Sequence, residues 1–118
     1  MSFTDILALS LVEVVGDFGF KFFANEGGIK NFAMGTTGYI GVVYFLIRSL
    51  QGSQLMIVNA GWDGMNAIVS ALAAYIFLGE RLDKPIRYFG IVLIVIGLMF
   101  LDLPLTRSKA FRFPKFFT

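Results

Sequence analysis

The chain has 118 residues, of which 57% are hydrophobic and 15% are charged, and its formal net charge is +2. This composition is too apolar for a small soluble domain, and so weak a positive charge gives little support to nucleic-acid binding. The absence of cysteine and histidine excludes disulfides, thiol nucleophiles, Ser-His-Asp triads and zinc sites built on these ligands. We therefore expect an integral, multi-pass membrane protein that is not an enzyme and uses no cofactor or metal.

Four apolar windows follow one another along the chain, each close to the length of about 20 residues that a membrane-spanning helix needs. They lie near residues 4–23, 32–50, 54–78 and 86–105. Because backbone groups in lipid must be hydrogen-bonded internally and the connections are short, we expect antiparallel helices. The predicted fold is an all-α bundle of four transmembrane helices over residues 1–105, which dimerises, followed by a tail over residues 106–118. The acids in the first window argue against a cleavable signal peptide.

The first window contains Glu13, Asp17 and Lys21 at a spacing of four, which places them on one helix face. Lys21 lies near the end of the window and can pair with Asp17 or extend to the membrane surface. Glu13 is the deepest charge, and desolvation favours the neutral form of a carboxyl, so this residue can exchange a proton for a cation. The structural alternative is a protonated Glu13 that is hydrogen-bonded to a neighbouring helix.

The glycines in GDFGF and GTTGYIG, within residues 16–41, are interpreted as helix-packing positions and not as phosphate-binding loops. The third window mixes small residues with polar ones, which predicts a helix in the interior of the bundle. Those polar residues are Asn59, Trp62, Asp63, Asn66 and Ser70. In the fourth window Gly90 and Gly97 share a face, which predicts a helix contact either within one protomer or between two.

Basic and aromatic residues alternate in LTRSKAFRFPKFFT, residues 105–118. Such a tail suits a membrane surface, where cations meet anionic headgroups and rings lie at the interface. A solvated, disordered tail is the alternative. Basic residues near the helix ends are almost balanced between the two sides of the membrane, which allows insertion in both orientations.

The stretch LVEVVGDFGFKF, residues 11–22, resembles the first helix of the small multidrug resistance family, within the drug/metabolite transporter superfamily. The stretch NAGWDGMNAIVSALAAYIFLGERLDKP, residues 59–85, is similar to that family's Trp-x-Gly segment and to the turn after its third helix. Tyr39, Gly90 and Gly97 fall where the family has an aromatic site residue and fourth-helix glycines. The resemblance covers roughly residues 3–103.

This resemblance implies a dimer, usually antiparallel, in which the paired first-helix Glu residues bind protons and a cationic substrate in competition. Glu13 would be the shared site for the proton and the cation, and Tyr39 and Trp62 would line the pocket. Gly90 and Gly97 would help to form the dimer contact. The expected function is proton-coupled export of a small cationic compound by alternating access, with protons, the cation, the lipid bilayer and a second copy as partners.

Three residues depart from the family pattern: Asp17 and Asp63 stand where small or hydroxyl residues are usual, and Asn59 replaces an aromatic residue. They make the expected pocket more anionic and less aromatic. A polar cation, such as a polyamine-like or guanidinium-like solute, is therefore favoured over a lipophilic drug.

Two other functions fit the same helices. In the first, the protein is a structural or accessory membrane component, and pairs such as Asp17 with Lys21 and Asp63 with Arg48 are fixed salt bridges. In the second, the helices move a lipid-linked substrate across the bilayer. Proton release on addition of candidate cations would separate cation transport from a structural role.

Overall fold

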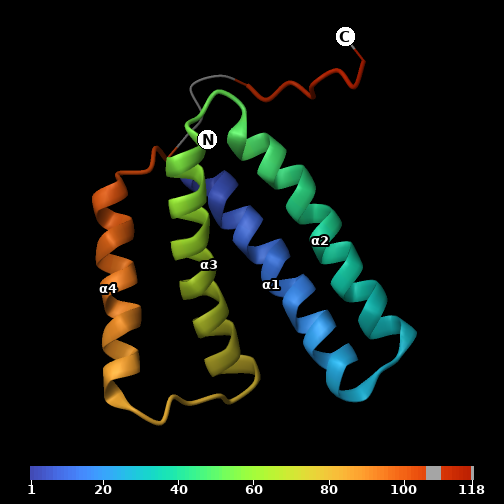
Figure 1. The fold of residues 1–118 in the computed structure, drawn as a ribbon, viewed down its shortest axis with the longest axis vertical. Coiled ribbons are helices and arrows are strands. Elements are labelled where there is room, and N and C mark those ends of the chain that lie inside the picture. Colours follow the sequence, from blue (N-terminus) through green and yellow to red (C-terminus); the bar gives the residue numbers. More distant parts are fainter. Residues whose placement is uncertain (106–109, 118) are drawn as a thin grey trace.

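A computed structural model of the protein describes residues 1–105 and 110–117 and contains four α-helices (Figure 1). They are α1 (Phe3–Glu26), α2 (Ile29–Leu50), α3 (Leu55–Phe77) and α4 (Pro85–Leu101). The all-α prediction is confirmed, and each helix covers most of one expected window. Part of the predicted tail, residues 106–109 and 118, lies outside the described residues. Within those that are described, no helix is both long enough and apolar enough to cross a membrane.

The helix boundaries follow from short local signals in the sequence. The backbone N–H of Asp5 donates to Ser2 Oγ at 3.2 Å, which caps the start of α1. Gly27 and Gly28, with φ of 73° and 99°, form the turn between α1 and α2, a conformation that glycine adopts without steric cost. Pro85 is the first residue of α4, where its missing N–H leaves no hydrogen bond unmade.

The four helices lie side by side in one layer, in the order α4, α3, α1, α2 (Figure 1). The described chain measures 47 × 38 × 18 Å along its principal axes. Helix α3 contacts α1 on one side and α4 on the other. Within the described chain, α4 contacts no helix other than α3. The layer is therefore open, with α2 and α4 at opposite edges.

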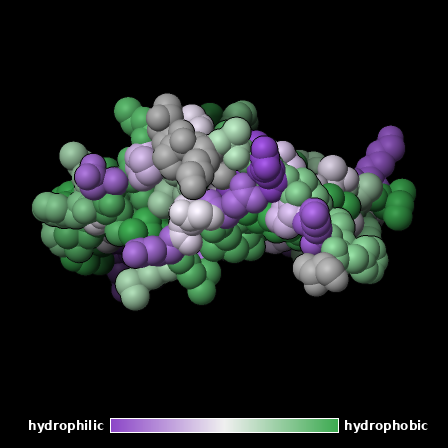
Figure 2. All heavy atoms as spheres, turned by 90° about the horizontal axis from the view of Figure 1, so that it is seen from above, coloured by the Kyte–Doolittle hydropathy of each residue, from purple (hydrophilic) through white to green (hydrophobic). Residues whose placement is uncertain are grey.

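The buried hydrophobic cluster lies between α1 and α3 and is small. Its members are Ile6, Val58 and Met65, and Trp62 packs against it. By contrast, α4 buries none of its residues, and hydrophobic side chains cover the α4 edge in the end-on view of Figure 2. Exposed apolar surface of this extent needs lipid or another protein to cover it.

Glycines bring α1 and α2 into backbone contact. A Cβ atom added at Gly19 or Gly38 would lie less than 3.0 Å from backbone atoms of the opposite helix, which real Cβ atoms essentially never do. At Gly16 it would collide with the ring of Tyr39, and at Gly35 with the ring of Phe20. These contacts confirm the interpretation of the glycines as helix-packing positions, because larger residues would push the two helices apart.

We expect Gly38→Ala to lower the free energy of unfolding by about 1–3 kcal/mol, because its methyl group would overlap the backbone of α1 at Gly16. Gly41→Ala is the matched control, since the atoms nearest to its methyl group would belong to the Val12 side chain, at 3.2 Å, and not to the backbone of α1. Alanine also favours a helix over glycine by about 1 kcal/mol. Unfolding in detergent, followed by circular dichroism, measures both variants. Equal stability of the two would contradict the backbone contact between α1 and α2.

Candidate functional site

Glu13 is half-buried near the middle of α1 and is bound by a side chain from α3. The indole N–H of Trp62 donates a hydrogen bond to Glu13 Oε2 at 2.7 Å. Trp62 also packs against the cluster that contains Ile6 and Met65, so core packing fixes the position of the donor. The carboxylate is thereby held in one orientation, and it joins α1 to α3.

Asp17 lies one turn further along α1 and is bound from the other side by α2. The hydroxyl of Tyr39 donates a hydrogen bond to Asp17 Oδ1. The Tyr39 ring lies against Gly16 and is 5.6 Å, between centroids, from the ring of Phe20. Because Gly16 has no side chain, the ring can reach across α1 to the carboxylate. Each of the two acids therefore has an aromatic donor, and the donors come from different helices.

The site carries negative charge that no described basic side chain neutralises. Asp17 stands one turn from Glu13 on α1, and Asp63 directly follows Trp62 on α3. The ion pairs within residues 1–105 and 110–117 are Lys21–Glu80, Arg48–Asp5 and Arg87–Asp83. None of them includes Glu13, Asp17 or Asp63, so a proton or an external cation is the chemical complement of this site.

Two salt bridges suggested by the sequence are wrong. Lys21 does not pair with Asp17; its Nζ lies 2.8 Å from Glu80 Oε2, in the connection after α3, while Tyr39 binds Asp17. Arg48 pairs with Asp5, not Asp63, at 2.8 Å. The physical reason is position: Arg48 is in the last turn of α2 and Asp5 in the first turn of α1, at the same end of the layer.

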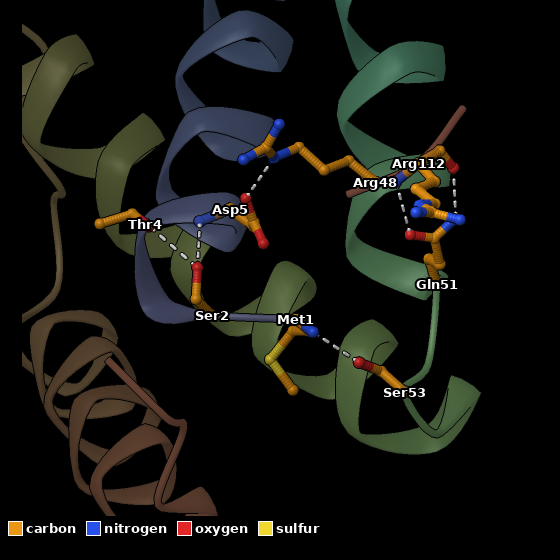
Figure 3. Close-up of polar contacts among 8 residues, drawn as sticks. All are labelled: Met1, Ser2, Thr4, Asp5, Arg48, Gln51, Ser53 and Arg112. Carbon is orange, nitrogen blue, oxygen red and sulfur yellow. Dashed lines mark hydrogen bonds and ion pairs between the residues drawn. The ribbon is translucent and has the colours of Figure 1, made fainter. Parts of the chain in front are cut away.

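The pair formed by Asp5 and Arg48 is the main feature that sequence reasoning missed (Figure 3). Only 4% of Asp5 is exposed, so its buried carboxylate needs a cationic partner, and Arg48 supplies one. The sequence did contain a signal, because a Ser followed three residues later by an acid before an apolar run is typical of a helix start. This signal does not show which basic residue pairs with Asp5.

Within the described chain, the remaining predicted residues form no hydrogen bond or ion pair with the two acids. Asp63 follows Trp62 on α3 and is exposed. Gly90 and Gly97 are on α4, where an added Cβ would find nothing within 4 Å, so neither glycine is a contact within the described protomer. The structure thus brings Glu13, Asp17, Tyr39 and Trp62 together and places the two glycines on α4, at an edge of the layer.

Four helices with short connections, together with an aromatic donor on a half-buried acid, define a small all-α protein with an acidic site between its helices. Residues 1–94 match the family described as Small Multidrug Resistance protein. The quaternary ammonium compound-resistance protein QacC of Staphylococcus aureus is 30% identical over 101 residues, which are 83% of this chain and 90% of that protein. The chain therefore belongs to the small multidrug resistance family, a family of integral membrane transporters.

Trp62 is the only tryptophan of the chain, so intrinsic fluorescence reports directly on the hydrogen bond to Glu13. We expect the emission of the wild-type protein to change with pH as the Glu13 carboxyl gains or loses its proton. Glu13→Gln should abolish this change, because an amide does not titrate, whereas Asp63→Asn should preserve it. A pH response of equal size in Glu13→Gln would show that another group controls the environment of the indole.

Proposed function

We propose that the protein exports a small polar cation in exchange for protons, and that both compete for Glu13. The observation that carries this proposal is the hydrogen bond from Trp62 to Glu13 Oε2. It holds one carboxylate oxygen, while the other oxygen accepts no hydrogen bond from the described chain. A carboxylate that is positioned but not neutralised is suited to bind a proton or a cation in turn.

Competition at one carboxylate couples the two movements. A cation is attracted to Glu13 only when the proton has left, and a returning proton removes the charge that held the cation. If the site opens to one side of the membrane at a time, each step moves only one of the two ligands. The curated relative from S. aureus is named for resistance to quaternary ammonium compounds, and these compounds are cations.

The additional acids favour a polar cation over a lipophilic one. Asp17 stands one turn from Glu13, and Asp63 lies beside Trp62. A solute with several N–H donors can bind more than one carboxylate at once, which a quaternary ammonium group without N–H donors cannot do. Trp62 and Tyr39 add ring faces that attract a cation. We therefore propose a guanidinium-like or polyamine-like substrate.

Two copies are needed to enclose such a site. One protomer is an open layer 18 Å thick, and Glu13 is only half-buried in it. On α4, the exposed apolar side chains accompany Gly90 and Gly97, which have open space above them. We propose that this face meets the same face of a second copy, so that two Glu13 residues share one cavity.

We expect Glu13→Gln to abolish the proton release that follows addition of a cation to purified protein. A pH indicator dye measures this release against a panel of guanidinium, polyamine and quaternary ammonium compounds. The fold should survive, because a neutral amide is less costly to bury than a charge. Asp17→Thr is the companion variant: it should retain proton release and shift the preference toward more lipophilic cations.

The alternatives give different results in the same assay. Undiminished proton release by folded Glu13→Gln protein would remove Glu13 from the mechanism. Silence of the wild-type protein over the whole panel would favour a structural or accessory role. Loss of the fold in Glu13→Gln, seen by circular dichroism, would favour the purely structural reading of the Trp62–Glu13 hydrogen bond.

The proposed dimer predicts that Gly97→Leu disrupts assembly. A leucine at this position would not clash within the protomer, because an added Cβ has nothing within 4 Å, but it would block close approach of a second α4. Size analysis in detergent should show a dimer for the wild type and a monomer or irregular aggregates for the variant. Phe100→Leu, at a position that is 85% exposed, is a control that keeps the surface apolar. A monomer in every case would contradict the dimer.

A further inference from the structure

The described parts of the chain after α4, residues 102–105 and 110–117, lie at the end of the layer where α1 begins (Figure 1). Asp102 ends α4 in a left-handed conformation, with φ of 51°. The carbonyl of Pro104 then accepts a hydrogen bond from the backbone N–H of Phe3 at 2.6 Å. The chain is described again from Ala110, and it then lies beside the end of α2. The tail therefore starts at one edge of the layer and reaches the opposite edge.

Two hydrogen bonds attach this segment to α2 (Figure 3). Gln51 Nε2 donates to the backbone carbonyl of Arg112 at 2.5 Å, and Gln51 Oε1 accepts from the backbone N–H of the same residue at 3.1 Å. In addition, the guanidinium of Arg48 lies 5.4 Å from the centre of the Phe111 ring. The backbone at Arg112 is thus fixed, while the Arg112 side chain takes no part in the two hydrogen bonds.

Aromatic rings continue outward from α2 along the tail. The ring of Phe111 is 5.9 Å from that of Tyr44 and 6.3 Å from that of Phe113, and the rings of Phe113 and Phe116 are 5.7 Å apart. Phe111 is partly buried, but Phe113 is 55%, Phe116 83% and Phe117 91% exposed. These outer rings have little protein around them.

The charge of the segment has one sign. After Asp102 the sequence contains no acidic residue, and the described part of the tail carries Arg112 and Lys115 between its phenylalanines. Both of these basic residues are exposed. Exposed rings alternating with cations are the composition of segments that lie in the headgroup region of a bilayer, where the rings reach the acyl boundary and the cations meet phosphates.

We propose that residues 110–117 form an interfacial anchor that binds the anionic lipid surface at this end of the helices. Arg112 and Lys115 contact headgroup phosphates, and Phe113, Phe116 and Phe117 insert at the acyl boundary. Gln51 and Arg48 hold the root of the segment against α2, so that the anchor extends laterally from the helices. This role is separate from cation export and does not depend on Glu13.

The chain contains no cysteine, so Phe117→Cys provides a single site for an environment-sensitive fluorophore on the full-length protein. The labelled protein is placed in nanodiscs of phosphatidylcholine alone or of phosphatidylcholine with phosphatidylglycerol. Aqueous iodide measures the exposed fraction of the label, and headgroup-level spin-labelled lipid measures the inserted fraction. We expect insertion in the anionic nanodiscs, with a shift of the label toward water as salt is raised.

Arg112→Gln combined with Lys115→Gln should lower the ratio of inserted to exposed label roughly 25-fold in anionic nanodiscs, since each basic residue contributes a factor of about five at such a surface. Lys30→Gln combined with Lys84→Gln removes the same charge from the opposite end of the helices and should leave the ratio unchanged. Phe113→Ser combined with Phe116→Ser should reduce quenching by the spin-labelled lipid. Circular dichroism checks that each variant is folded.

Two results would overturn the anchor. Equal protection of the label in both lipid mixtures and in detergent would show that the tail binds only to its own protein. Full access of iodide in both lipid mixtures would show that the tail lies in water. Neither result would affect the proton-release assay on Glu13, so failure of the anchor is distinguishable from failure of the proposed export function.

Discussion

A carboxylate on a largely apolar helix needs a hydrogen-bond donor, and this need determines how the helices of the protein meet. Trp62 on α3 supplies the donor for Glu13, and Tyr39 on α2 supplies the donor for Asp17. An acid left without such a partner would add a desolvation cost of several kcal/mol, on the order of the total stability of a small domain. The two acids on α1 therefore connect it to both of its neighbours, and the site lies where the three helices meet.

The glycines of α1 and α2 make the hydrogen bond between Tyr39 and Asp17 possible. Gly16 leaves room for the Tyr39 ring, and the contacts at Gly19 and Gly38 bring the two backbones together. On the other side, α4 packs on α3 through Leu98, which lies close to Gly64. Helices α1 and α2 are thus closely packed, and so are α3 and α4. Few large side chains are buried in the described helices. Stability depends on backbone proximity more than on a central core.

The sequence predicted the four helices and most of the residues that the structure brings together around Glu13, because both depend on local patterns. Hydrophobic windows give the helices, and the spacing of Glu13 and Asp17 places them on one face. The family resemblance gave Trp62 and Tyr39 as pocket residues, and the structure places both on the acids. Their role in binding a proton or a cation stays a prediction.

Ion pairs could not be predicted in the same way. Lys21 and Arg48 have long flexible side chains with several carboxylates within reach, so their partners depend on how the helices and connections are placed in space. The open, single-layer arrangement could not be predicted either. Short connections show that neighbouring helices are antiparallel, but they do not show whether the layer closes into a bundle. Both features are set by tertiary contacts between residues distant in the sequence.

The contacts between α1 and α3 differ in strength between the two ends of the layer. In Figure 1, α1 and α3 are close at the end that holds the termini and diverge toward the other end. Buried Ile6 and Val58 hold the narrow end, while Lys21 and Glu80, each about half exposed, bridge the wide end. An exposed pair of this kind contributes only about 0–1 kcal/mol. The contact between α1 and α3 is therefore strong at the narrow end and weak at the wide end, and the Glu13–Trp62 hydrogen bond lies between these two contacts.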